Sequence, residues 1–134
     1  MIDLTQVKAG DTLPAFEKES ITKVQLAKYA GASGDYNPLH LDDEFAKEVG
    51  MDGVIAHGML VMGFLGQYAM EIAANQAKLA RFNMRFGKMT KPGDIIICHG
   101  NVKDKANKEV TIDLFAVKQD EDVVGTGEAV FTLT

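Results

Sequence analysis

One segment of the sequence gathers residue types that transfer protons. It reads Gly34-Asp35-Tyr36-Asn37-Pro38-Leu39-His40. Proline fixes its own φ and disfavours the helical conformation in the residue before it, so Asp35 and His40 are expected on a rigid loop shaped by Asn37 and Pro38. Histidine changes protonation near neutral pH, and a carboxylate beside it can carry a second proton or orient the ring. The segment therefore indicates general acid–base chemistry.

A simpler interpretation of the same segment stays open on the residues alone. Asp35 and Asn37 can form side-chain turns to the backbone that only fold the chain, with His40 as a partly buried loop residue. A calcium loop fits poorly, because the sixth position would be His40 in place of glycine and the twelfth Ala46 in place of glutamate. The three histidines of the chain show no short zinc-ligand spacing. We therefore predict no metal site.

A second candidate feature is the segment Ile55-Ala56-His57-Gly58-Met59, at the start of a predicted long helix. Backbone N–H groups in the first turn of a helix have no acceptor within it and can bind an oxyanion. Gly58 has no Cβ, so a ligand carbonyl could approach its N–H closely. A helix cap that uses glycine only for a tight entry is an equally open alternative.

The elements that must position these features begin with three predicted helices. Thr22 is the expected N-cap of the first. The third is apolar around nearly its whole circumference, which is typical of a buried helix. Gly63 and Gly66 lower its helix propensity and indicate close approach of another element. The predicted ranges are 23–31, 42–49 and about 57–79.

After these helices the apolar residues recur at every second position. Phe82, Met84 and Phe86 alternate with polar residues, which predicts a strand with one buried face. Further strands are predicted at about 95–102, 110–118 and 123–133, with a first strand near 12–20. The class is α+β, with an antiparallel sheet packed against one central helix. A chain of 134 residues predicts one domain, 1–134.

The composition limits the class of partner. The chain has 14 Lys plus Arg and 19 Asp plus Glu, a net charge of −5, which argues against a protein that coats nucleic acid. Residues 72–93 depart from this average because they hold five basic residues and no acid. This basic window could contact an anionic ligand, or it could be an ordinary solvated strand face. It comprises Lys78, Arg81, Arg85, Lys88 and Lys91.

Other sequence features bear on the compartment. Cys98 is the single cysteine and lies in an apolar run typical of a buried strand, which favours a reducing compartment. The N-terminus lacks a basic segment followed by an apolar one. The longest nearly apolar run, 58–74, is shorter than the roughly 20 residues of a membrane-spanning helix. We therefore expect a cytoplasmic protein without a membrane partner.

The two candidate features together resemble the MaoC-like hydratase family, which comprises (R)-specific enoyl-thioester hydratases and 3-hydroxyacyl dehydratases with the hot-dog fold. The signature is matched by Tyr29, the Gly34–His40 motif and Ala46 after a five-residue gap. The His57-Gly58-Met59 segment and the closing Gly127-Glu128-Ala129-Val130 also look like the family. The resemblance implies an antiparallel sheet wrapped around a long central helix.

The resemblance also implies a reaction, the interconversion of trans-2-enoyl and (3R)-3-hydroxyacyl thioesters. Asp35 and His40 would be its catalytic pair, the Gly58 N–H would hold the thioester carbonyl, and His57 would support the site. No cofactor is implied, because CoA or phosphopantetheine is the substrate carrier. Some hydratases of the family carry a serine where this chain has Gly66, which leaves the choice of carrier open.

The basic window gains an expected role from the same resemblance. Arg81, Arg85, Lys88 and Lys91 could contact the phosphates of CoA or of a phosphopantetheine arm, or an acidic acyl carrier protein. An edge strand of such a sheet would pair with a second copy, so a homodimer or higher homo-oligomer is expected, with a heterodimer as an alternative. Two other functions stay open, an acyl-thioesterase and a subunit that is active only with a homologous partner.

Overall fold

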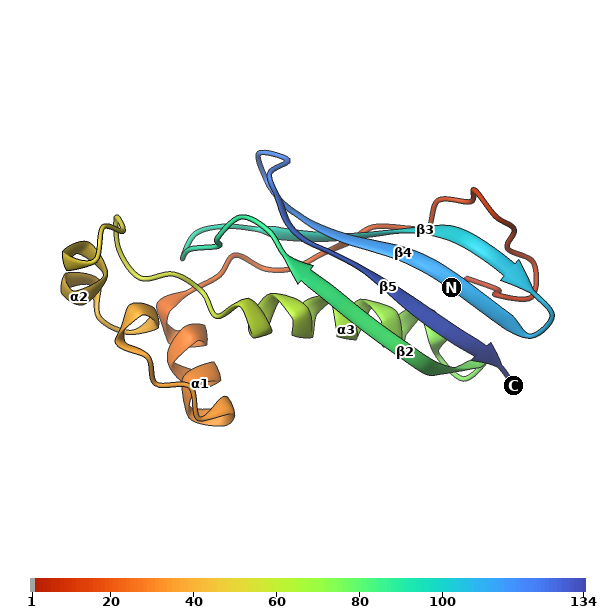
Figure 1. Cartoon of the computed structure of the whole chain (residues 1–134), viewed down its shortest axis with the longest axis horizontal. Coiled ribbons are helices and arrows are strands. Elements are labelled where there is room, and N and C mark those ends of the chain that lie inside the picture. The colour runs from red at the N-terminus through yellow and green to blue at the C-terminus, as the bar shows by residue number, and fades with distance from the viewer. Residues whose placement is uncertain (1) are drawn as a thin grey trace.

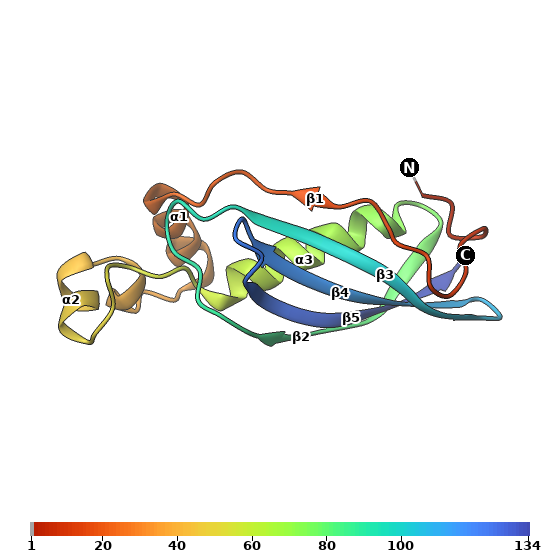
Figure 2. The same ribbon diagram turned by 90° about the horizontal axis from the view of Figure 1, so that it is seen from above.

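A five-stranded antiparallel sheet curls around one long helix in the computed structural model, which describes residues 2–134 (Figures 1 and 2). The strand order is β1-β3-β4-β5-β2, so the last three strands of the chain form a meander and β2 is an edge strand. This arrangement confirms the predicted α+β class. The strands are β1 Phe16–Glu17, β2 Ala77–Phe86, β3 Ile96–Ala106, β4 Glu109–Lys118 and β5 Val123–Leu133.

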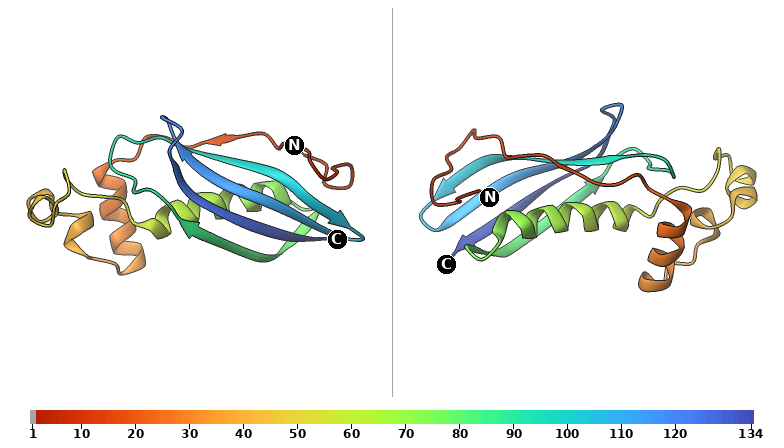
Figure 3. Two further views of the ribbon diagram at one scale, coloured as in Figure 1. Left: turned by 45° about the horizontal axis from the view of Figure 1, so that its top comes forward. Right: turned by 180° about the vertical axis from the view of Figure 1, so that it is seen from behind.

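The central helix, α3 (Gly58–Ala73), packs its apolar side on the concave face of the sheet. Leu65 and Ala69 on that side are fully buried. The prediction of burial all round is wrong, because Met59 and Met70 are 54% and 55% exposed on the other side. In the view from behind, α3 lies in front of the sheet with its outer side uncovered (Figure 3). No helix of the described residues is long and apolar enough to cross a membrane.

The end of α3 also differs from the prediction, since the helix stops at Ala73 and not near residue 79. Ala74 adopts a positive φ of 46°, and the chain then enters β2 at Ala77. Residues 77–79 pair with the last strand, with Leu79 opposite Phe131. Backbone pairing with β5 therefore replaces the additional helical turn.

Three details of the structure depart from the sequence expectations. Gly63 has no atom within 4 Å of an added Cβ, so no neighbouring element in the described chain approaches it closely. Phe86, expected on the buried face of its strand, is 56% exposed. Its ring, at the end of β2, lies against Gly58 in the first turn of α3. The predicted first strand is shorter than expected, being β1 with an isolated bridge from Thr12 to Asn101. Cys98 is buried in β3 as predicted.

Three short helical segments gather at the end of the molecule where α3 begins (Figure 1). Helix α1 (Lys23–Ser33) is capped by Thr22, whose hydroxyl accepts the N–H of Gln25 at 3.0 Å. Helix α2 (Asp43–Glu48) is capped by Asp42. The 3-10 turn η1 (Pro38–His40) lies between them. These local signals place the proton-transfer segment next to the N-terminus of α3.

Candidate functional site

The loop after α1 is shaped by the residues that the motif contains. Gly34 ends the helix in the left-handed conformation, with φ of 78°. Asp35 Oδ1 accepts the N–H of Asn37 at 3.2 Å, and Asn37 Oδ1 accepts the N–H of Leu39 at 3.0 Å. Pro38 then begins η1. Both side-chain turns of the simpler interpretation are therefore present, but Asp35 Oδ2 takes no part in them.

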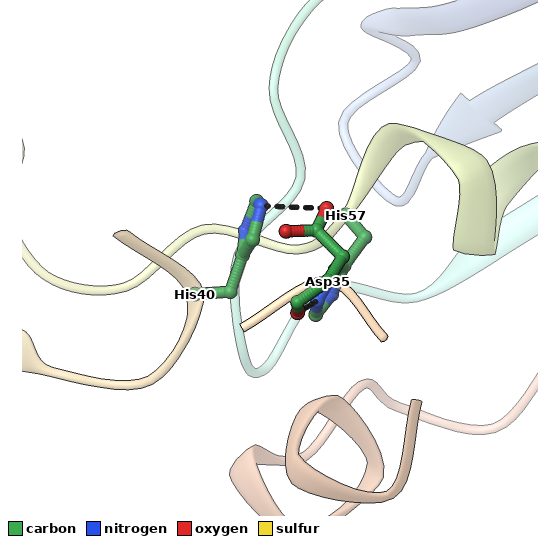
Figure 4. A group of neighbouring side chains, drawn as sticks. All are labelled: Asp35, His40 and His57. Atoms are coloured by element: carbon green, nitrogen blue, oxygen red, sulfur yellow. Dashed lines mark hydrogen bonds and ion pairs between the residues drawn. The ribbon is translucent and has the colours of Figure 1, made fainter. Parts of the chain in front are cut away.

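His40 faces that second carboxylate oxygen (Figure 4). Its Nδ1 lies 2.8 Å from the carbonyl oxygen of Ile55. A carbonyl oxygen only accepts, so Nδ1 carries the hydrogen and Nε2 of the neutral ring has a free lone pair. Nε2 lies 3.8 Å from Asp35 Oδ2, which is longer than an N–H···O hydrogen bond. Both atoms are therefore available to a third group placed against them.

His57 supports this pair from the protein side. It is 2% exposed, and its Nε2 donates to the carbonyl oxygen of Asp35 at 3.1 Å. Its ring stacks on His40, with centroids 3.9 Å apart and planes at 23°, and Tyr29 packs edge-on at 4.8 Å. The buried Nδ1 has no hydrogen-bond partner among residues 2–134. His57 therefore holds both the backbone of Asp35 and the plane of the His40 ring.

The same three side chains form a potential donor set for a metal ion, since ligand atoms of Asp35, His40 and His57 lie within 4.8 Å of one another. A metal binds imidazole in the plane of the ring. The two stacked rings have planes only 23° from parallel and centroids 3.9 Å apart, so their in-plane lone pairs do not meet at one ion. The arrangement favours proton transfer over metal coordination.

Gly58 is the first residue of α3 and lines a cavity of about 160 Å³ together with His40 and Phe86. Its N–H makes no hydrogen bond within the described part of the chain. An added Cβ would lie 3.1 Å from the Phe86 ring, so the cavity is narrow here. The structure thus brings an imidazole and a helix N-terminal N–H to the same cavity.

The structure places only some residues of the basic window near the cavities. Lys88 lines the cavity beside His40 and forms an ion pair with Asp122 at 3.5 Å. Lys91 lines an adjoining pocket of about 420 Å³. Arg81 and Arg85 are exposed on β2 and line neither space. Two of the four predicted anion contacts therefore lie at the site.

Several groups at the site were not identified from the sequence. The backbone carbonyl of Ile55 holds His40, and the carbonyl of Thr90 accepts the N–H of Ala56 at 2.7 Å. Every residue has a backbone carbonyl, so the residue type does not indicate which carbonyl accepts a hydrogen bond at the site. The fold is needed to identify it. Asp94 was not singled out, although its burial, at 4% exposed, is unusual for a carboxylate.

Comparison with known proteins gives a consistent result. Residues 5–124 match the family described as MaoC like domain. The chain is 31% identical over 97 residues to peroxisomal multifunctional enzyme type 2 of Mus musculus, covering 68% of this chain and 13% of that protein. It spans 10–29% of the length of the first curated relatives that it matches.

Solved structures are similar over nearly the whole chain. R-hydratase PhaJ1 from Pseudomonas aeruginosa has a TM-score of 0.87 and 26% identity, covering 96% of this chain and 83% of that one. The (R)-hydratase from A. caviae involved in PHA biosynthesis has a TM-score of 0.83 and 25% identity, covering 96% and 98%. These likenesses, with the observed sheet, confirm the hot-dog fold.

Proposed function

The chain belongs to the family of MaoC-like domains, and we propose that it catalyses the reversible addition of water to a trans-2-enoyl thioester, giving the (3R)-3-hydroxyacyl thioester. The observation that carries the proposal is the placement of Asp35 Oδ2 opposite His40 Nε2, 3.8 Å apart beside a cavity that Gly58 also lines. The (R)-hydratases similar to this chain over 96% of its length support the proposal.

The proposed reaction uses both members of the pair. A water molecule held between Asp35 Oδ2 and His40 Nε2 loses a proton to one of these bases as its oxygen bonds to C3. The electrons of the double bond move toward the thioester carbonyl oxygen. The proton is then delivered to C2, so the protein ends with the protons it began with. Such acid–base assistance contributes about 10²–10⁴-fold to a rate.

The carbonyl oxygen becomes negative as C3 is attacked, and Gly58 is suited to bind it. Its N–H has no intrahelical acceptor, and the aligned dipoles of α3 favour negative charge at this end of the helix. One preorganised donor of this kind contributes about 10²–10³-fold. The backbone N–H of Gly58 can therefore polarise the thioester carbonyl.

The carrier of the acyl group is proposed to be a phosphopantetheine thioester, either CoA or acyl carrier protein. Lys88 and Lys91 lie beside the two adjoining cavities and supply positive charge for phosphates of the arm. Arg81 and Arg85 lie further along β2, so contact with them would require a ligand that extends along the edge strand.

The proposal is tested by incubating the purified chain with crotonyl-CoA and with longer enoyl thioesters on CoA and on carrier protein. Loss of the enoyl-thioester absorbance and formation of the (3R)-hydroxyacyl product are expected. Release of free thiol without hydroxyacyl product would instead show a thioesterase and overturn the proposal.

Gly58→Ala is expected to lower kcat for hydration by about 10²-fold. Alanine keeps the N–H, but its methyl would hold the thioester carbonyl away from it, with an effect similar to the loss of one oxyanion donor. The new methyl would lie 3.1 Å from the Phe86 ring, in the space that the thioester carbonyl needs. Steady-state kinetics measure the effect. Gly63→Ala in the same helix, where a Cβ meets open space, is the matched control. Equal activity of the two variants would contradict the role given to Gly58.

A second copy of the chain is the proposed partner. Within residues 2–134, strand β2 pairs only with β5, so its outer edge, ten residues long, presents unpaired backbone groups. Pairing of this edge with its equivalent would extend the sheet across a two-fold axis. Light scattering at micromolar concentration is expected to give the mass of two chains or more. A monomer that becomes active only with a homologous chain would instead indicate a heterodimer.

A further inference from the structure

A nearly buried ion pair lies at the wall of the larger cavity, which the Lys118 side of the pair lines. Asp94, in the turn before β3, is 4% exposed, and the side chain of Lys118, the last residue of β4, is also mostly buried. Lys118 Nζ lies 3.6 Å from Asp94 Oδ2. Gln119 completes the cluster by donating to Asp94 Oδ1 at 3.1 Å and accepting the N–H of Ile95 at 2.9 Å.

Each member of the ion pair also binds one backbone group of the cavity wall. Asp94 Oδ2 accepts the N–H of Lys91 at 2.9 Å. Lys118 Nζ donates to the carbonyl oxygen of Met89 at 3.2 Å. These two backbone groups flank Thr90 on either side. The pair therefore fixes the position of the Thr90 carbonyl without contacting it.

That carbonyl is the link to the candidate site. It accepts the N–H of Ala56 at 2.7 Å. The preceding residue, Ile55, holds His40 Nδ1 through its own carbonyl, and Gly58 follows two residues later. A displacement of Thr90 would therefore move the groups that orient His40 and present the Gly58 N–H.

A gain in folding stability does not explain why this ion pair is buried. Removing two charges from water is costly, and apolar replacements of buried ion pairs are often neutral or stabilising. Burial raises the pKa of Asp94, but the N–H of Lys91, the amide of Gln119 and the Lys118 ammonium together hold it below its ordinary value. The carboxylate is thus kept charged where its contacts to the cavity wall depend on the charge.

We propose that Asp94 and Lys118 are positioning residues for the hydration reaction, acting through Met89, Thr90 and Lys91 on the 55–58 segment. This inference rests on the proposed function. A shift of about 1 Å in a catalytic group can cost about 10²-fold in rate. We therefore expect Asp94→Asn and Lys118→Met to lower kcat by about 10- to 100-fold. KM should change little in Asp94→Asn, whereas Lys118→Met also removes a cation that lines the larger cavity. Lys118→Arg, which keeps a cation, should retain most of the activity.

The matched control is Val110→Ala. Val110 is fully buried near the start of β4, whereas Lys118 ends that strand, so this variant destabilises the sheet away from the site. Its kcat, measured well below its melting temperature, should equal that of the unmodified chain. Hydrogen exchange of the Ala56 N–H supplies a readout independent of activity. It should become faster in Asp94→Asn and Lys118→Met than in Val110→Ala.

The outcomes separate the two proposals. An unmodified chain without hydratase activity overturns the proposed function, and Ala56 exchange then decides alone whether the ion pair holds the segment. With an active chain, wild-type kcat in both Asp94→Asn and Lys118→Met overturns the positioning role. A loss of kcat without faster Ala56 exchange overturns it as well, because the pair would then act by another route.

Discussion

Asp35→Asn and His40→Gln are each expected to lower kcat for crotonyl-CoA hydration by about 10²–10⁴-fold, the usual contribution of a positioned acid or base. Asparagine keeps an oxygen that can accept the N–H of Asn37, so the loop is retained while the proton-carrying group is lost. Glutamine at position 40 can still donate to the Ile55 carbonyl but has no titratable nitrogen. Because the two groups act on one water molecule, the double variant should be little worse than either single one.

Stopped assays of hydroxyacyl product and thermal unfolding together check this expectation, since the variants should unfold near the temperature of the unmodified chain. Asp42→Asn is the matched control. It makes the same substitution seven residues away, at the N-cap of α2, where asparagine caps as well as aspartate. It should keep wild-type kcat. Full activity in both Asp35→Asn and His40→Gln would show that other groups carry the protons.

The parts of the fold that could be predicted are those with local signals. A Thr22 hydroxyl reaches an N–H three residues on, and the Asp42 carboxylate does the same for α2. Strand β5 has the predicted bounds because turn residues at 119–122 mark where it begins. In each case the interacting groups are close in sequence, so the residue types alone identify the element.

The failures concern groups whose environment is set by distant parts of the chain. Helix α3 was predicted to continue to about residue 79, but the edge of β5 offers residues 77–79 backbone partners. Met59 and Met70 are as apolar as the buried side of the helix. The position of the sheet decides which side of α3 is buried, and the local sequence of the helix does not indicate that position.

The candidate site shows the same division. Asp35 and His40 were identified because they share one short motif, and the structure brings them to 3.8 Å. The Ile55 carbonyl holds His40, and the Thr90 carbonyl holds the N–H of Ala56 next to it. Both groups belong to the backbone and lie 15 and 50 residues beyond His40. The basic window was contiguous in sequence, but an extended strand spreads its charges along β2, so only its last two lysines reach the cavities.

Gly127→Ala is expected to have the largest effect on stability of any single methyl added to this chain's glycines. Gly127 lies opposite Met84 where β5 pairs with β2. An added Cβ would lie 2.0 Å from the backbone oxygen of Asn83 and 3.1 Å from Met84 Cα. Backbone atoms cannot rotate away as a side chain can, so β2 must separate from β5. Overpacking costs about 1–3 kcal/mol and occasionally more, and we expect a loss of about 3 kcal/mol.

Urea denaturation at one fixed protein concentration measures this change, and Gly63→Ala is its matched control. At that exposed helical position a Cβ meets open space, so alanine should raise the free energy of unfolding by about 0.5–1 kcal/mol. Adding a methyl group thus lowers the free energy of unfolding at Gly127 and raises it at Gly63, because only Gly127 faces backbone atoms of another strand. Separation of β2 would also shift Phe86 and Lys88, which line the cavity beside His40, so Gly127→Ala should lose hydratase activity before it unfolds. A stable, active Gly127→Ala variant would contradict the register of β2 against β5, and with it the position of that cavity wall.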